Sequence, residues 1–145
     1  MEGIRGNKVL TGTWGELWIN GEKIFEFSKI SFKVTANRET VQIGLDEDSK
    51  IVGLKGEGSY TVKKVYTRAK EVLESWQKGK DVRASIIAKL EDPDASGGQI
   101  ERWSCENVWH NELPVVNWEK GAIVEEEVTI GFTPTDLKNL DAIAA

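Results

Sequence analysis

The stretch that decides the fold is 11–27, which reads TGTWGELWINGEKIFEF. Two short runs rich in aromatic and β-branched residues meet there at Asn20-Gly21. Asparagine and glycine both tolerate the positive φ angles that a tight type I′ turn requires. The stretch therefore predicts a β-hairpin near the start of the chain.

Length, charge and cysteine content limit the classes of protein that this chain can be. A chain of 145 residues is expected to form one domain, 1–145. Its net charge of −5 is the wrong sign for a surface that grips nucleic-acid phosphates. The single cysteine, Cys105, cannot form an intramolecular disulfide, which favours a reducing compartment.

Neither a secretory signal nor a membrane span is visible in the sequence. The first residues lack an apolar signal region, and no apolar run approaches the roughly 20 residues that a membrane span needs. We therefore expect the chain to be intracellular when made, with no membrane association.

Alternating apolar and polar residues predict strands over much of the chain. The clearest alternation begins at Ile30, and similar runs follow near 82–90, 100–109 and 122–132. In the last run Glu125 and Glu127 fall on the non-core side, while Glu126 interrupts the apolar phase. The core side of the 100–109 run is expected to hold Trp103, Cys105 and Trp109.

A single helix is predicted midway, over about 67–78, from apolar residues at helical spacing. Thr67 is the expected N-cap, and Gly79 is the expected C-terminal stop. Short strands with one inserted helix predict a mainly β fold: an antiparallel β-sandwich or partly closed barrel with one flanking α-helix.

Three segments are expected to extend from this domain. Residues 1–13 form an N-terminal arm, residues 44–58 a long loop or protruding hairpin, and residues 134–145 a C-terminal tail. The glycines of 44–58 lose much freedom on ordering. We therefore expect this segment to be mobile until a neighbouring subunit supplies contacts.

Catalytic and metal-binding patterns are weak in this sequence. Cys105 lies in phase with two tryptophans, which predicts a buried thiol and no nucleophile paired with His110. Soft ligands at zinc spacing are missing, and the acidic run 46–48 lacks the glycine of an EF-hand loop. In a strand Glu125 and Glu127 point away from Glu126, so they predict a solvated face. We expect no enzyme, no cofactor and no metal.

The six tryptophans leave two interpretations open. They could form a stacking platform for sugars or another ligand on a monomeric β-sandwich. Alternatively, they serve packing and subunit contacts, since interfaces are enriched in tryptophan. In that second interpretation Trp76 packs the helix, while the tryptophans expected at rims or contacts are Trp14, Trp18 and Trp118.

Three stretches carry a resemblance to a known family. The run GTWGELWINGEK at 12–23 resembles the opening hairpin of tail-tube proteins from contractile phage tails. These include PBSX-type defective prophages and R-type bacteriocins. The runs AKLEDPD at 88–94, with ERW at 101–103, and EEEVTIGFT at 125–133 resemble later parts of the same proteins, in the same order.

The resemblance implies a structural subunit that forms hexameric rings stacked into a hollow tube. Adjoining sheets would continue into one barrel around a lumen for DNA or ion passage. The implied partners are further copies of the chain and the sheath, baseplate and tape-measure proteins, without specific nucleic-acid binding. The implied location is the host cytoplasm during assembly, then the tail of a virion or phage-like particle.

Specific residues can be assigned to these roles as hypotheses. Glu125 and Glu127 are expected to face a predominantly acidic lumen, because fixed positive charge would retain DNA. The expected subunit or ring contacts are Trp14, Trp18, Ile51, Val52 and Leu54. Two alternatives remain: a monomeric ligand- or carbohydrate-binding β-sandwich, and a small hydrolase with a pocket around His110 or the glutamates.

Overall fold

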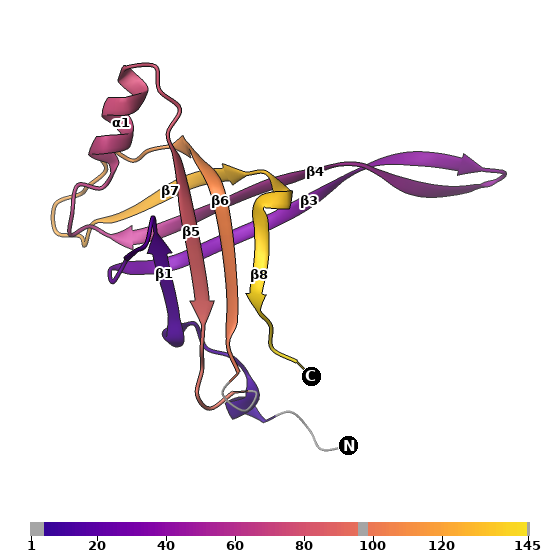
Figure 1. The fold of residues 1–145 in the computed structure, drawn as a ribbon, viewed down its shortest axis with the longest axis horizontal. Helices are drawn as coiled ribbons and strands as arrows, with labels where there is room; N and C mark the ends of the chain where they lie inside the picture. Colours follow the sequence, from indigo (N-terminus) through magenta and orange to yellow (C-terminus); the bar gives the residue numbers. More distant parts are fainter. Residues whose placement is uncertain (1–4, 96–98, 145) are drawn as a thin grey trace.

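The computed structural model describes residues 5–95 and 99–144, which form one antiparallel sheet and one α-helix (Figure 1). The strand order is β2-β1-β5-β6-β7-β4-β3, and β8 pairs with β6. The elements are β1 Gly15–Ile19, β2 Glu22–Lys23, β3 Phe27–Ile43, β4 Asp46–Lys63, α1 Ala69–Gln77, β5 Arg83–Leu90, β6 Glu101–Glu112, β7 Glu125–Phe132 and β8 Leu137–Asp141.

The opening hairpin forms as predicted. Asn20 and Gly21 adopt φ angles of 52° and 80°, and Trp18 stands opposite Lys23. The turn is also tied to β5, because the Asn20 side-chain oxygen accepts a hydrogen bond from the Ser85 N–H at 2.9 Å.

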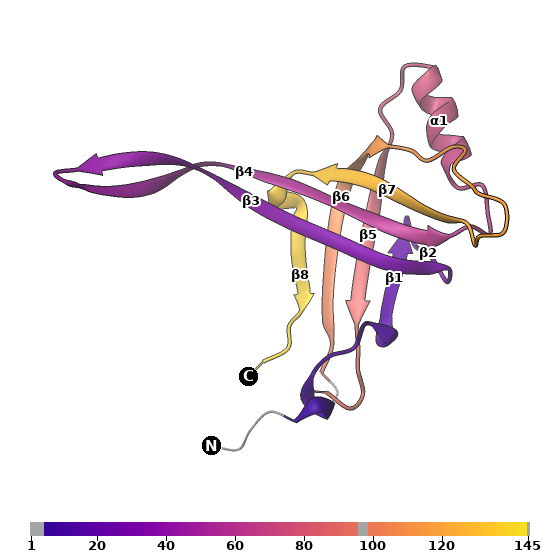
Figure 2. The ribbon, with the colours of Figure 1, turned by 180° about the vertical axis from the view of Figure 1, so that it is seen from behind.

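The sheet folds over into two crossing layers, with β1, β5, β6 and β8 in one and β3, β4 and β7 in the other (Figures 1 and 2). Strand β6 forms the corner. One edge pairs with β5, and the other pairs with β8 through 102–105 and with β7 through 109–112. This confirms a mainly β, antiparallel, partly closed fold with one flanking helix.

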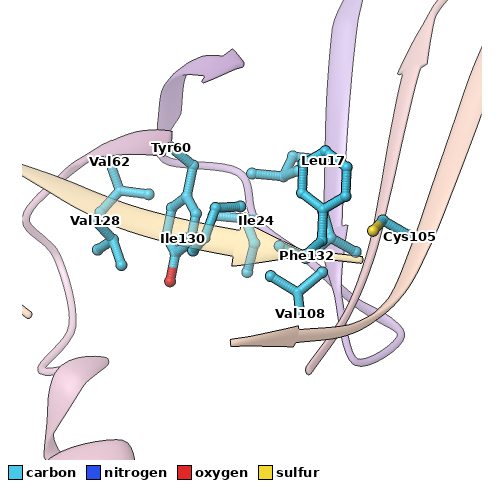
Figure 3. Packing of buried hydrophobic residues seen from close by; sticks show 10 residues of the cluster. Leu17, Ile24, Tyr60, Val62, Cys105, Val108, Val128, Ile130 and Phe132 are labelled. Carbon is cyan, nitrogen blue, oxygen red and sulfur yellow. The ribbon is translucent and has the colours of Figure 1, made fainter. Parts of the chain in front are cut away.

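The core lies between the two layers (Figure 3). Its buried side chains come from β1, β4, β5, β6 and β7 and from Ile24 after β2, while β3 and β8 add partly buried ones. Cys105 is completely buried among them, as expected. The buried hydrophobic cluster is Leu17, Ile24, Tyr60, Val62, Ile86, Cys105, Val108, Val128, Ile130 and Phe132.

Helix α1 lies within the predicted range of 67–78. It ends at Gln77 with Lys78 as its C-cap. Gly79 follows with a φ of +75° and an N–H bond of 2.9 Å to the Trp76 carbonyl, which confirms the predicted stop. The predicted Thr67 cap is wrong: Arg68 occupies the N-cap position without a capping side chain. The helix covers one end of the core, and it is neither long nor apolar enough to cross a membrane.

The expected extensions differ in part from the structure. Segment 44–58 is not a loop, because it forms the turn of the β3–β4 hairpin and most of strand β4, the second of the two predicted alternatives. The expected tail 134–145 contains a strand, since β8 pairs with residues 102–105. In the expected arm 1–13, residues 6–8 and 12–14 form short 3₁₀ turns. Residues 1–4 of the arm and Ala145 of the tail lie outside the described part of the chain.

Candidate assembly surfaces

The β3–β4 hairpin extends well beyond the rest of the domain (Figures 1 and 2). Within β4, only residues 56–63 pair with strand β7. Farther out, the two strands of the hairpin pair with each other, and every residue from 37 to 52 is exposed. At the turn Gly44 has a φ of +60°, and the Leu45 side chain is fully exposed. We call residues 33–55 the finger.

An apolar row runs from the core onto the finger. Every second residue of a strand shares a face, so Val34 and Ala36 continue the row of the core-packed Phe32. Leu54 stands opposite Ala36 on this face. A bulge follows, and Ile51 stands opposite Arg38 beyond it.

Three of the five side chains that the sequence assigned to contacts lie on the finger. Ile51, Val52 and Leu54 are 48%, 57% and 52% exposed. Full burial of such a side chain stabilises a structure by about 1.5–3 kcal/mol. About half of each side chain is exposed in the single chain, so a contact with another molecule could still supply much of this free energy.

The opposite face of the β3, β4 and β7 layer is polar, and Glu125 and Glu127 lie on it. Glu125 stands opposite Lys63, and both glutamates are exposed. Glu126 points inward, in phase with the apolar residues of β7. It is 4% exposed on the core side, where its carboxylate lies 3.1 Å from the Lys64 ammonium.

A row of paired residues crosses this polar face from β5 to β3: Arg83, Trp109, Gly131, Glu57 and Lys33. The Arg83 guanidinium stacks 4.9 Å from the Trp109 ring centre. The ring covers Gly131 so closely that a Cβ there would lie 2.4 Å from the indole nitrogen. Glu57 lies 3.4 Å from the Lys33 ammonium.

Two tryptophans predicted for the core are elsewhere. Asn107 has a φ of 56° within a register shift between β5 and β6, so Cys105 and Val108 both face the core and Trp109 faces outward. Trp103 shares the face of Cys105, but it is 36% exposed at the edge of the core.

The tryptophans are distributed over several surfaces. Trp103 lines a depression of about 370 Å³ and Trp118 lines another of about 300 Å³. Trp14 is 48% exposed, while Trp18 is partly buried with the Lys23 ammonium 5.9 Å from its ring. The contact roles of Trp14 and Trp18 stay predictions.

The titratable side chains Cys105 and Tyr60 are packed in the core, and His110 contacts Tyr60. Burial raises the pKa of Cys105 to about 11, with smaller contributions from Asp136 and Glu106. The Tyr60 hydroxyl lies 3.3 Å from Nε2 of His110, and burial lowers the pKa of that histidine. The described residues contain no group of three or more side chains placed to hold a metal ion.

The alternating pattern from Ile30 predicts burial of Val34 and Ala36, so their place on the exposed apolar row was not expected from the sequence. One signal was available. The alternation starting at Ile30 belongs to a strand of 17 residues, whereas strands usually have about 3–10 residues. Such a length indicates that part of the strand leaves the domain.

The finger, the polar face and the partly closed sheet define a candidate assembly module. The chain matches a family model described as "Phage tail tube protein" over residues 2–141. It therefore belongs to the phage tail tube protein family, a family of structural, non-enzymatic proteins.

Solved structures share this fold over most of their length. One is a chain of the extracellular contractile injection system PVC sheath–tube complex in the extended state, with a TM-score of 0.71, 12% identity, and 92% of this chain and 93% of that chain covered. Another, from the anti-feeding prophage cap that terminates the tube, has a TM-score of 0.71, 12% identity and 97% coverage of both chains.

A chain of the anti-feeding prophage baseplate is also similar, with a TM-score of 0.61, 8% identity, and 87% of this chain and 90% of that chain covered. At these identities the likeness shows the fold. A search of curated proteins found no match.

Proposed function

We propose that this chain is the tube subunit of a contractile phage tail or phage-like particle, in which hexameric rings stack around a lumen. The observation that carries the proposal is the finger. Its apolar row continues from the core but stays largely exposed in the single chain. A second copy of the chain would bury this row.

The finger residues are the proposed contacts between subunits or rings. Ile51, Val52 and Leu54 would pack against a neighbouring copy, with Trp14 and Trp18 as further contacts. Strand β3 ends the order of paired strands in the described sheet, so a strand of a neighbour can add to its outer edge. Such addition would join the sheets of successive copies into one barrel.

The polar face of β3, β4 and β7 is the proposed lumen wall, because the core and α1 lie on its other side. Glu125 and Glu127 would then point into the bore. This face also carries lysines. However, Lys63 stands opposite Glu125, and Glu57 lies 3.4 Å from Lys33 and 4.0 Å from Lys55.

The lumen charge proposed from this face is therefore mixed, not predominantly acidic, because Lys29 also lies on it, opposite Thr61. Carboxylates beside the lysines reduce the attraction of the wall for phosphate groups. DNA or ions could then pass without being retained at fixed cations.

The proposed partners outside the tube are a sheath, a baseplate and a tape-measure protein. Two of these are supported by fold relatives, which come from a sheath–tube complex and from a baseplate. The proposed location is the host cytoplasm during assembly and the particle tail afterwards.

Light scattering of the purified chain over a concentration series, with negative-stain images of the same samples, tests this proposal. We expect folded monomers when dilute, then hexameric rings and stacked tubes as concentration rises. Monomers at every concentration and salt would contradict the proposal and favour a monomeric ligand-binding β-sandwich.

A further inference from the structure

An exposed aromatic patch lies at the end of the β3–β4 ladder opposite the fingertip. Phe25, Val65 and Tyr66 are 82%, 63% and 60% exposed. They come from the connections that precede β3 and follow β4. Together with Arg68 they line a depression of about 450 Å³. We call these three apolar residues the aromatic patch.

Cations hold the rings of the aromatic patch in place. The Arg68 guanidinium lies 5.0 Å from the Tyr66 ring centre and is anchored by a hydrogen bond to Glu26. The Lys23 ammonium lies 5.0 Å from the Phe25 ring centre. Positioned aromatic side chains beside arginine are typical of the residues that dominate binding energy in protein interfaces.

The fingertip also exposes large apolar side chains. Ile43 is 59% exposed and Leu45 is fully exposed. The acidic run 46–48, Asp-Glu-Asp, follows directly. The fingertip, residues 43–48, is therefore an apolar point with negative charge beside it.

One chain cannot bring its own fingertip to its own aromatic patch. The patch lies next to the start of β3, and the fingertip lies at the end of β3 (Figures 1 and 2). Strand β3 has 17 residues, and at about 3.3 Å per residue it holds the two sites roughly 50 Å apart. The partner for each site must be another molecule.

We propose that the fingertip of one subunit docks on the aromatic patch of a second copy of this chain. Leu45 and Ile43 would pack on the Phe25 and Tyr66 rings. The contact would be apolar, because Lys23 pairs with Glu16 and Arg68 pairs with Glu22 and Glu26. Contact between unlike ends is heterologous and generates closed rings or continuing helices, as a tube requires. The inference rests on the proposed function and adds the surface that receives the finger.

A single contact of this kind is small, so it would hold two free subunits only weakly. Within a ring or a stack, the other contacts raise the effective concentration of each fingertip at its patch. The proposal therefore predicts a contact that is present in tubes and absent from dilute monomers.

Disulfide trapping tests the contact. A Glu47→Cys, Val65→Cys double variant keeps Leu45, Phe25 and Tyr66 in place, and the native Cys105 thiol is buried. After tubes form and are oxidised, non-reducing gels should show a ladder of linked subunits beyond the dimer. Mixed Glu47→Cys and Val65→Cys single variants should stop at dimers.

A second double-cysteine variant, with the same fingertip thiol but its partner thiol away from the patch, is the control for disulfide trapping. In a Glu47→Cys, Leu140→Cys variant, the second thiol replaces a half-exposed residue of β8, away from the patch. Tubes with a ladder from this pair, and none from the Val65 pair, would overturn the docking proposal while leaving the proposed function intact. Absence of tubes from the wild-type chain would overturn both.

Substitution of the patch gives a second readout. Phe25→Ala should leave the melting temperature unchanged, because 82% of the residue is exposed. It should raise the concentration needed for tube formation about tenfold, as loss of an interface aromatic does. Val9→Ala, at 61% exposure, is the control. An unchanged assembly concentration for Phe25→Ala would overturn the proposal.

Discussion

The substitution Leu54→Asp tests whether Leu54 is a contact residue between subunits or a core residue of the single chain. Leu54 lies on the apolar row of the finger, opposite Ala36, and is 52% exposed. Full burial of leucine contributes about 1.5–3 kcal/mol, so the single chain loses only about 1 kcal/mol through the buried half. A domain with a typical stability of about 5–15 kcal/mol stays folded after that loss.

The same substitution should abolish assembly. In the proposed contact the remaining half of Leu54 is buried, and an unpaired carboxylate would have to leave water, which costs several kcal/mol. That cost is repeated at every subunit of a ring. We expect a fall of only about 2–4 °C in the melting temperature, together with loss of tubes in negative-stain images and in pelleting assays.

Thr35→Asp is the matched control. Thr35 is an exposed finger residue next to Ala36 in sequence, so it points to the opposite face and stands opposite Lys55. It adds the same charge and should leave assembly intact. Unfolding of the Leu54→Asp monomer would place Leu54 in the core, and normal tubes from that variant would refute its contact role. Equal loss of tubes in both variants would show that added charge alone blocks assembly.

Three further predictions concern the domain itself. Gly131→Ala should destabilise the fold by about 1–3 kcal/mol, because its Cβ would displace the Trp109 ring; denaturant melts with tryptophan fluorescence measure this. Glu126→Ala should cost about 1–3 kcal/mol in thermal melts, because it leaves the mostly buried Lys64 ammonium without its carboxylate. Burial lowers the pKa of His110 from its ordinary value of 6.5, so the unfolded chain binds the proton more tightly. Stability should therefore fall as pH drops below about 6.5, by up to about 1.4 kcal/mol per pH unit from this group. Denaturant melts at pH 7 and 5 should show a smaller fall in His110→Phe.

Controls for these predictions come from neighbouring positions. Gly12→Ala should be neutral, because nothing lies within 4 Å of a Cβ there. Glu127→Ala should change stability by less than about 0.5 kcal/mol, since the side chain is exposed. Equal losses in Glu126→Ala and Glu127→Ala, or equal losses in the two glycine variants, would contradict the packing described. An unaltered pH dependence in His110→Phe would contradict the role given to burial.

Local signals in the sequence predict the parts of the fold that depend on local chemistry. Asn20-Gly21 predicts its hairpin, and Gly79 predicts the end of the helix, because positive φ is needed at both places. Alternation predicts the strands and the outward face of Glu125 and Glu127.

The remaining features depend on partners far away in sequence. Glu126 is buried beside Lys64, a partner 62 positions away, so its own neighbours could not indicate burial. The bulge at Asn107 turns Trp109 outward, and no turn residue other than the asparagine marks it. Among the candidate contact residues, Leu54 was identifiable as apolar within a glycine-rich segment, but the finger that carries it became visible only with strand pairing.

Imaging of assembled tubes by cryo-electron microscopy tests the central claim most directly. We expect six copies per ring, with the finger of each copy packed on a neighbour and the side chains of Glu125 and Glu127 pointing into the bore. A tube with the α1 side of the domain lining the bore, or fingers that reach solvent without touching another copy, would contradict it.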